Sequence, residues 1–162
     1  MPNHVTNRLV FSAEDASRIT AECVTNGTFD FASLIPPPPQ IYLGNLSAED
    51  SRDFQCNWDT WNRANWGTKW GAYDGLVGEL DGGLGFIQFD TAWSVPYPVI
   101  AALANRYKCQ FEHRYFDEGH CFWGVEIWAD GSRVSKRYKH YDDYAPLCIE
   151  LKGYDPNNRK ED

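Results

Sequence analysis

The stretch "LVGELDGGLGFIQFD", residues 76–90, decides the fold of this 162-residue chain. Two apolar runs, residues 76–80 and 84–90, flank the turn Asp81-Gly82-Gly83. Glycine accepts a positive φ without steric penalty, so such a turn joins two antiparallel strands. The stretch therefore predicts a β-hairpin, from which the other segments can be placed.

The segments after this hairpin continue as helix and strand. An apolar stripe that starts at a proline predicts a helix over residues 98–107. Residues 109–116 and 120–128 alternate between apolar and polar side chains and predict a second hairpin, which ends the sheet. The chain from Ser132 carries basic residues among tyrosines, and residues 151–162 are predicted to be a polar tail.

A strand, a helix and a long insert come before the first hairpin. Residues 4–11 alternate and predict a strand, after which Ser12 fits the N-cap of a helix. Four prolines at residues 36–39 force an extended segment, because proline fixes φ and lacks an amide hydrogen. A short helix is predicted over residues 57–65, so that residues 36–65 form an insert in the main fold.

The predicted order is strand, helix, strand, strand, helix, strand, followed by one extra strand. This is the split βαβ or ferredoxin-like plan (βαββαβ), an α+β fold in which two helices cover one face of an antiparallel sheet. We therefore expect a single ferredoxin-like domain over residues 1–150 that carries the insert. The name describes topology alone, since no cysteine spacing suits an iron–sulfur cluster.

Composition narrows the classes of function. The net charge of −8 opposes binding to long nucleic acids, where basic residues neutralise phosphates. Five cysteines without a CxxC pair favour reduced thiols over disulfides or a metal site. The chain lacks a membrane-length apolar run and a signal-peptide pattern, so we expect no membrane contact and a cytoplasmic location. The aromatic share of 15%, with seven tryptophans, predicts rings that line a cleft or interface.

Four phrases resemble one family: "MPNHVTNRL" at the start, "NWGTKW" at residues 65–70, "TAWSVPYPVI" at residues 91–100 and "YFDEGHCFWG" at residues 115–124. In this order they are similar to the YubB-type ferredoxin-like domain family, small proteins of phages, plasmids and related mobile elements. The resemblance covers most of the chain up to about Gly124 and is most specific at "NWGTKW" and "TAW". It implies the fold and a mobile-element setting, hence a host cytoplasm, but no activity.

These motifs supply the main candidate binding site. Trp66 and Trp70 either cap the core or stack on a planar ligand while Lys69 meets its phosphate or carboxylate. Trp93 either packs over the next helix or forms the opposite wall of a cleft, with Thr91 as a hydrogen-bonding group. The predicted ligand-binding residues are Asn7, Arg8, Asn65, Trp66, Lys69, Trp70, Thr91, Trp93 and His113.

Histidines are the candidates for acid–base chemistry near neutral pH. His113 is predicted to be either a half-buried imidazole or a proton relay with Glu126, and His120 lies beside Glu118 in a turn. No Ser-His-Asp order, HExxH, Walker loop or GxGxxG is present. We expect a protein that is not an enzyme and has no cofactor or catalytic residue, with a small His-dependent hydrolase as an alternative.

The segment "RVSKRYK", residues 133–139, is a basic island in an acidic chain. It is either a solvated face or the rim of an anion-binding site. The preferred hypothesis is a phage-like accessory protein that binds a small phosphorylated or nucleotide-like ligand in an aromatic and basic cleft, sequestering a host signalling nucleotide. The alternative from another class is a module that inhibits a host protein. Whether the cleft closes only in a homo-oligomer is left open by the sequence.

Overall fold

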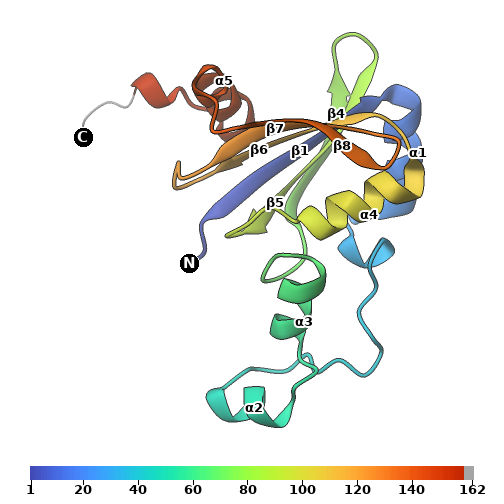
Figure 1. Cartoon of the computed structure of the whole chain (residues 1–162), viewed down its shortest axis with the longest axis vertical. Helices are drawn as coiled ribbons and strands as arrows, with labels where there is room; N and C mark the ends of the chain where they lie inside the picture. The colour runs from blue at the N-terminus through green and yellow to red at the C-terminus, as the bar shows by residue number, and fades with distance from the viewer. Residues whose placement is uncertain (159–162) are drawn as a thin grey trace.

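A six-stranded antiparallel sheet forms the centre of the computed structural model, which describes residues 1–158 (Figure 1). In spatial order its strands are β4 (Tyr73–Leu80), β5 (Leu84–Ala92), β1 (His4–Ser12), β6 (Phe111–Asp117), β7 (Trp123–Ala129) and β8 (Ser132–Tyr138). All five pairings are antiparallel. The first strand in sequence therefore lies in the middle and joins the two predicted hairpins, β4–β5 and β6–β7, into one sheet.

Helices cover both faces of this sheet (Figure 1). α1 (Ala13–Cys23) and α4 (Tyr97–Tyr107) share one hydrophobic cluster and so lie on the same face. α5 (Tyr141–Lys152) covers the other face. The second cluster, under α5, consists of Phe116, Val125, Leu147, Cys148 and Leu151.

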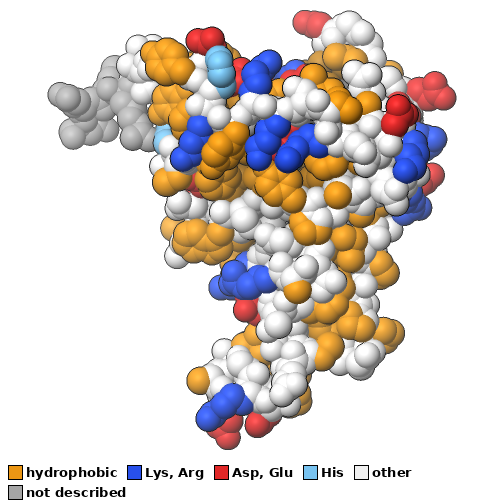
Figure 2. Space-filling model, viewed as in Figure 1, with side chains coloured by type: hydrophobic (Ala, Val, Ile, Leu, Met, Phe, Trp, Pro, Cys, Tyr) orange, Lys and Arg blue, Asp and Glu red, His pale blue; other side chains and the backbone are white. Residues whose placement is uncertain are grey.

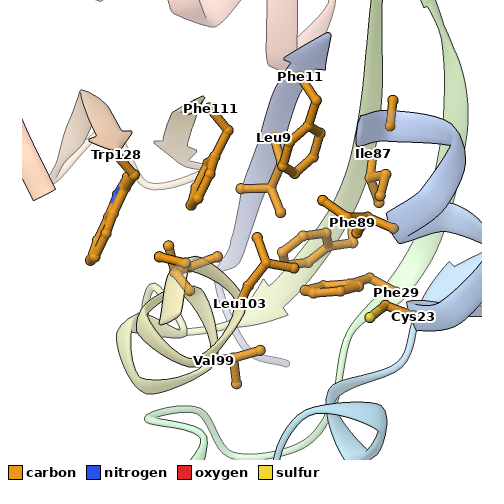
Figure 3. Close-up of a cluster of buried hydrophobic side chains, with 14 of the residues drawn as sticks. Leu9, Phe11, Cys23, Phe29, Ile87, Phe89, Val99, Leu103, Phe111 and Trp128 are labelled. Atoms are coloured by element: carbon orange, nitrogen blue, oxygen red, sulfur yellow. The ribbon is translucent and has the colours of Figure 1, made fainter. Parts of the chain in front are cut away.

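The main core lies between α1, α4 and the sheet (Figure 3). Successive side chains of a strand point to opposite faces, so alternate residues of β1 and β5 enter this core. Burying each large apolar side chain contributes about 1.5–3 kcal/mol. Buried members labelled in Figure 3 are Leu9, Phe11, Cys23, Phe29, Ile87, Phe89, Val99, Leu103, Phe111 and Trp128.

Short elements fill the chain between α1 and β4, and α2 and α3 project away from the sheet (Figure 1). The predicted helix over residues 57–65 is confirmed as α3, which begins after its N-cap Asn57. A capping box of Ser47 and Asp50 starts α2. The elements of this region are β2 (Val24–Thr25), β3 (Thr28–Phe29), η1 (Phe31–Ser33), α2 (Ala48–Asp53) and α3 (Trp58–Asn65).

The C-terminal part differs from the expectation. The second hairpin does not end the sheet, because residues 132–138 pair with β7 as β8. α5 was not predicted either; it runs to Lys152, and a 3-10 turn, η2 (Pro156–Asn158), follows. All residues of β8 are exposed, so it lacks an apolar alternation, and Pro146 inside α5 obscures the helical pattern. None of the helices in the described part of the chain has the length and hydrophobicity needed to cross a membrane.

Candidate functional site

An aromatic groove lies where the start of α4 meets β6, β8 and the turn before β7. Its volume of about 390 Å³ falls within the range of small-ligand sites. We call it the aromatic groove; its lining residues are Gly67, Trp93, Ser94, Val95, Tyr97, Pro98, Tyr115, Phe122 and Tyr138.

Trp93 is held in this groove in an unusual backbone conformation. Its φ is +69°, and the left-handed region costs a bulky residue roughly 1–2 kcal/mol. The loop opposes this cost with hydrogen bonds: the Thr91 hydroxyl donates to Ser94 O (2.7 Å) and the Ser94 hydroxyl donates to Gly67 O (2.6 Å). The Trp93 amide also donates to Asn3 O (3.0 Å). The ring is thereby kept out of the core, with 49% of the residue exposed.

Tyr138 on β8 is the second half-exposed ring, and two lysines flank it. Lys136 Nζ lies 5.0 Å from the Tyr138 ring centroid and 5.6 Å from that of Tyr97. Lys139 Nζ lies 5.7 Å from the Tyr138 ring centroid. Within residues 1–158 neither lysine has an ion pair with a carboxylate. Figure 2 shows lysine and arginine side chains among hydrophobic ones over β8, so the groove borders a basic and aromatic surface.

A buried carboxylate supports the groove from behind. Glu126 accepts hydrogen bonds from Trp128 Nε1 (3.2 Å) and Arg133 Nη1 (3.1 Å). Burial alone would raise the pKa of Glu126, but the nearby His113, with bonds from Tyr97 and Trp128, outweighs burial and holds the pKa below its usual value. An ionised Glu126 therefore fixes Arg133 beside Tyr97, where its guanidinium carbon lies 5.9 Å from the ring centroid.

The tyrosines of the groove stay neutral. The Tyr97 hydroxyl donates to the Tyr115 hydroxyl (3.1 Å). Burial, with the charge of Glu126, raises the pKa of Tyr97 to about 12, and burial raises that of Tyr115 as well. Gly124 makes room for the Tyr115 phenol, because a Cβ there would lie only 2.5 Å from the phenol Cζ. Both rings therefore offer neutral hydroxyls, and neither adds negative charge near Lys136.

His113 continues the buried network into the sheet. Its Nε2 lies 3.0 Å from Asn7 Oδ1, which only accepts, so Nε2 carries a hydrogen. Its Nδ1 lies 3.5 Å from Glu126 Oε2, long for a hydrogen bond, and has no other partner. The predicted relay partners do face each other, but in the interior.

Of the predicted binding residues, only Trp93 reaches the aromatic groove with its side chain. Asn7, Thr91 and His113 are fully buried, so direct contact with a ligand is not available to them in this structure. Their role is to bond one another: Asn7 Nδ2 donates to Thr91 Oγ1 (3.0 Å). The same burial removes His113 from solvent, so a hydrolase that uses His113 is disfavoured, whereas one that uses His120 is not tested by this burial.

Arg8 lies on the opposite face of the sheet, under α5. Its Nε donates to Gln88 Oε1 (2.8 Å) and its Nη1 to Glu150 Oε1 (2.9 Å). Burial lowers its pKa, and Glu150 partly offsets that effect. Because adjacent residues of a strand point to opposite faces, Arg8 and Asn7 cannot serve one site.

Trp66 belongs to the core, the structural alternative weighed for it. Its Nε1 donates to Ile35 O (2.9 Å), and its ring meets Phe31 edge-on at a centroid distance of 5.7 Å. This contact fastens the proline segment to the main core. The ring is therefore engaged by the protein itself.

The rest of the "NWGTKW" loop touches the groove through its backbone. Gly67 lines the groove, whereas Asn65 bonds the carbonyl of its own helix at Trp61 (2.9 Å). Lys69 Nζ lies 5.1 Å from the Trp70 ring centroid, outside the groove lining. The structure thus brings the loop to Trp93 but not the side chains of Asn65, Lys69 and Trp70.

The sequence argument missed Tyr97, Phe122 and Tyr138 as groove residues. Tyr97 stands in the quoted phrase "TAWSVPYPVI" and Phe122 in "YFDEGHCFWG", so both motifs carried the signal. Tyr138 and Lys136 belong to the basic island, for which an anion-binding rim was the second alternative. Across residues 1–158, no cluster of three or more His, Cys, Asp or Glu side chains is arranged to hold a metal ion.

Comparisons with known proteins identify a family for part of the chain. Residues 65–146 match the family model described as a ferredoxin-like domain in Api92-like protein. No curated protein matches the chain. A solved structure, the protein Api92 from Yersinia pseudotuberculosis, is similar with 14% identity and a TM-score of 0.46 over 52% of this chain. The similarity spans 30% of the length of that protein.

Proposed function

The chain belongs to the family of ferredoxin-like domains in Api92-like proteins, and on this premise we propose that it is a non-enzymatic binding protein. Its ligand joins a planar ring to an anionic group, as a mononucleotide does, and occupies the aromatic groove. The mobile-element setting and the sequestration of a host signalling nucleotide are part of this proposal. The proposal also includes the topology. The split βαβ plan is formed by β1, α1, β4, β5, α4 and β6, and β7, β8 and α5 are additions to it.

One observation carries the proposal: the half-exposed Trp93 ring stands in a groove bordered by Lys136 and Lys139, neither of which has a carboxylate partner within residues 1–158. A residue held at positive φ by loop hydrogen bonds marks a site where the backbone is strained, and such strain concentrates at functional sites. Stacking of a base on an aromatic ring contributes about 1–3 kcal/mol. Lys136 and Lys139 supply charge for a phosphate that the rings cannot hold.

The family match supports the place of this site. Trp93, Tyr97, Phe122, Lys136 and Tyr138 all lie within residues 65–146, the part of the chain that the family model covers. The site is therefore built on the family's own domain. Gly67 also lies within the matched range, and none of the groove-lining residues in the described part of the chain comes from the insert at residues 36–65.

The test is binding of AMP, ADP, cyclic AMP and adenosine, measured by thermal shift and tryptophan fluorescence. Ligand that binds the native state raises its stability, so we expect a concentration-dependent shift with the phosphorylated members. Trp93→Ala and Lys136→Gln should each weaken binding about tenfold, the loss of one stacking or charged contact. Trp70→Ala and Lys69→Gln are matched controls, because they remove a ring and a lysine outside the groove.

Two outcomes would overturn the proposal. One is the absence of any shift across the panel. The other is equal loss of binding in Lys69→Gln and Lys136→Gln, which would move the site to the "NWGTKW" loop.

The exposed apolar side chains of the insert favour a protein-interaction module as a second candidate. Leu43 is 75% exposed and Phe54 is 44% exposed, in a part of the chain that projects from the sheet. Such residues are typical of contact surfaces. A host-protein complex that Leu43→Ser weakens and Trp93→Ala does not would select this candidate.

A further inference from the structure

A second cavity, of about 600 Å³, lies on the face of the sheet that carries α5. Thr6 lines it, and Thr6 precedes the buried Asn7 on β1, so the two side chains point to opposite faces. This cavity, here called the polar pocket, is therefore separate from the aromatic groove. The lining groups that the argument uses are His4, Thr6, Asp90, Glu118 and Lys152.

Two carboxylates are fixed at the polar pocket through one oxygen each. Asp90 Oδ1 accepts the Thr6 hydroxyl (2.6 Å), and Glu118 Oε2 accepts the His4 amide (2.9 Å). The second oxygen of each carboxylate has no hydrogen bond within residues 1–158. The fold thus orients both groups and leaves one acceptor of each for another molecule.

The ammonium group of Lys152 also lines the polar pocket, but it does not contact the two carboxylates. Lys152 Nζ donates to His4 O (2.9 Å), which leaves two of its three hydrogens unassigned. Burial lowers the pKa of Lys152, and the charges of Asp90, Glu118 and Asp117 oppose that change. Yet no ion pair joins Lys152 to any carboxylate among residues 1–158. Opposite charges therefore line one cavity but stay apart.

A neighbouring tyrosine fixes the His4 ring at the edge of the pocket. The Tyr73 hydroxyl lies 2.6 Å from His4 Nδ1. Burial, with the charges of Asp90, Asp74 and Glu118, raises the pKa of Tyr73 to about 12, so its phenol stays neutral. Tyr73 thus holds the His4 ring without adding a charge.

We propose that the polar pocket binds a small zwitterion that carries both an ammonium and a carboxylate group, as an α-amino acid does. The ammonium donates to the open oxygens of Asp90 and Glu118, and the carboxylate accepts from Lys152. Charge-assisted hydrogen bonds of this kind are stronger than neutral ones. A simple amine leaves Lys152 without a partner, and a simple anion leaves Asp90 and Glu118 without one. Only a ligand with both charges pairs with the whole pocket.

Calorimetric titration of the full chain with L-alanine, L-leucine and L-glutamine tests this assignment, with methylamine and acetate as single-charge probes. We expect saturable binding of at least one amino acid, and binding of methylamine and of acetate weaker by about tenfold or more, because each lacks one charged contact. Asp90→Asn and Lys152→Met should each weaken that binding by about tenfold or more, because each removes one charged contact. Asp81→Asn, in the exposed hairpin turn, is the matched control and should bind as the parent chain does.

A second measurement keeps the test decisive if Lys152→Met fails to fold. Amide chemical shifts of the parent chain should then move at His4, Asp90, Glu118 and Lys152 on titration, and stay unchanged at Trp93. Methylamine binding as tight as that of the amino acids would overturn the zwitterion assignment, as would no saturable binding of any of the three. Trp93→Ala tests the aromatic groove separately, since it leaves this pocket intact.

Discussion

Glu126 and His113 lie opposite each other on β7 and β6, with Oε2 and Nδ1 3.5 Å apart and both side chains fully buried. The carboxylate also bonds Arg133, which reaches the wall of the aromatic groove. The pair therefore links the interior of the sheet to the groove. Its first consequence is for stability, because a buried charge without its partner is costly.

Glu126→Gln should lower the free energy of unfolding by about 3 kcal/mol, since it leaves the buried His113 and Arg133 without their carboxylate. Urea denaturation followed by circular dichroism measures this change. Asp81→Asn, an exposed carboxylate in a turn, should change stability by less than about 0.5 kcal/mol. A loss for Glu126→Gln as small as that of the control would contradict the buried pair.

The contribution of Glu126 to the free energy of unfolding should depend on pH. The folded pKa of Glu126 lies below its ordinary value of 4.5, so its contribution to stability is present above that value and is lost as the pH falls through the lower folded pKa. The stability difference between the parent chain and Glu126→Gln should therefore shrink on acidification. Denaturation series at neutral pH and at about pH 3 measure it. A difference that stays constant would show that Glu126 is not charged in the folded protein.

Trp93→Gly should separate stability from binding. Glycine adopts φ +69° without the penalty that tryptophan carries, so stability should be unchanged or rise by about 1 kcal/mol. Binding of AMP should weaken about tenfold, because the stacking ring is removed. Thermal denaturation and fluorescence titration give the two quantities, and a clear loss of stability would mean that the ring is part of the core.

Trp66→Ala should give the opposite result. Its ring packs against the core and its Nε1 bonds Ile35 O, so the substitution should cost about 2 kcal/mol or more of stability. AMP affinity should change little once the protein is folded. Denaturation and titration of the same sample test both parts, and a selective loss of affinity would place Trp66 in the binding site.

Glu150 on α5 lies on the other face of the sheet, where we expect a substitution to lower the free energy of unfolding by a smaller amount. Its Oε1 accepts from Arg8 Nη1 (2.9 Å) and Arg114 Nη1 (2.6 Å), and all three side chains remain partly exposed. Glu150→Gln should therefore cost about 1–2 kcal/mol, less than a fully buried pair. Glu112→Gln is the matched control and should cost less, because within residues 1–158 this carboxylate bonds Arg114 alone.

The sequence by itself determined the local structure. The glycine turn at residues 81–83 and the alternation around it specify the β4–β5 hairpin, and the apolar stripe after Pro98 specifies α4, because both signals lie within one element. β8 and α5 escaped prediction since neither has a clear apolar periodicity: β8 is exposed on every residue, and α5 contains Pro146. Their positions depend on contacts with β7 and β6.

Only the tertiary structure decided which of the motif tryptophans is packed on the core and which is exposed. Trp66 and Trp93 stand in motifs of similar appearance, yet Trp66 packs on Phe31 while Trp93 is held outward by bonds among Thr91, Ser94 and Gly67. The aromatic groove joins residues from four separate segments, and the polar pocket joins residue 4 to residue 152. The apolar periodicity of a single segment cannot predict these contacts between distant residues, because the contacts depend on the order of the strands in the sheet.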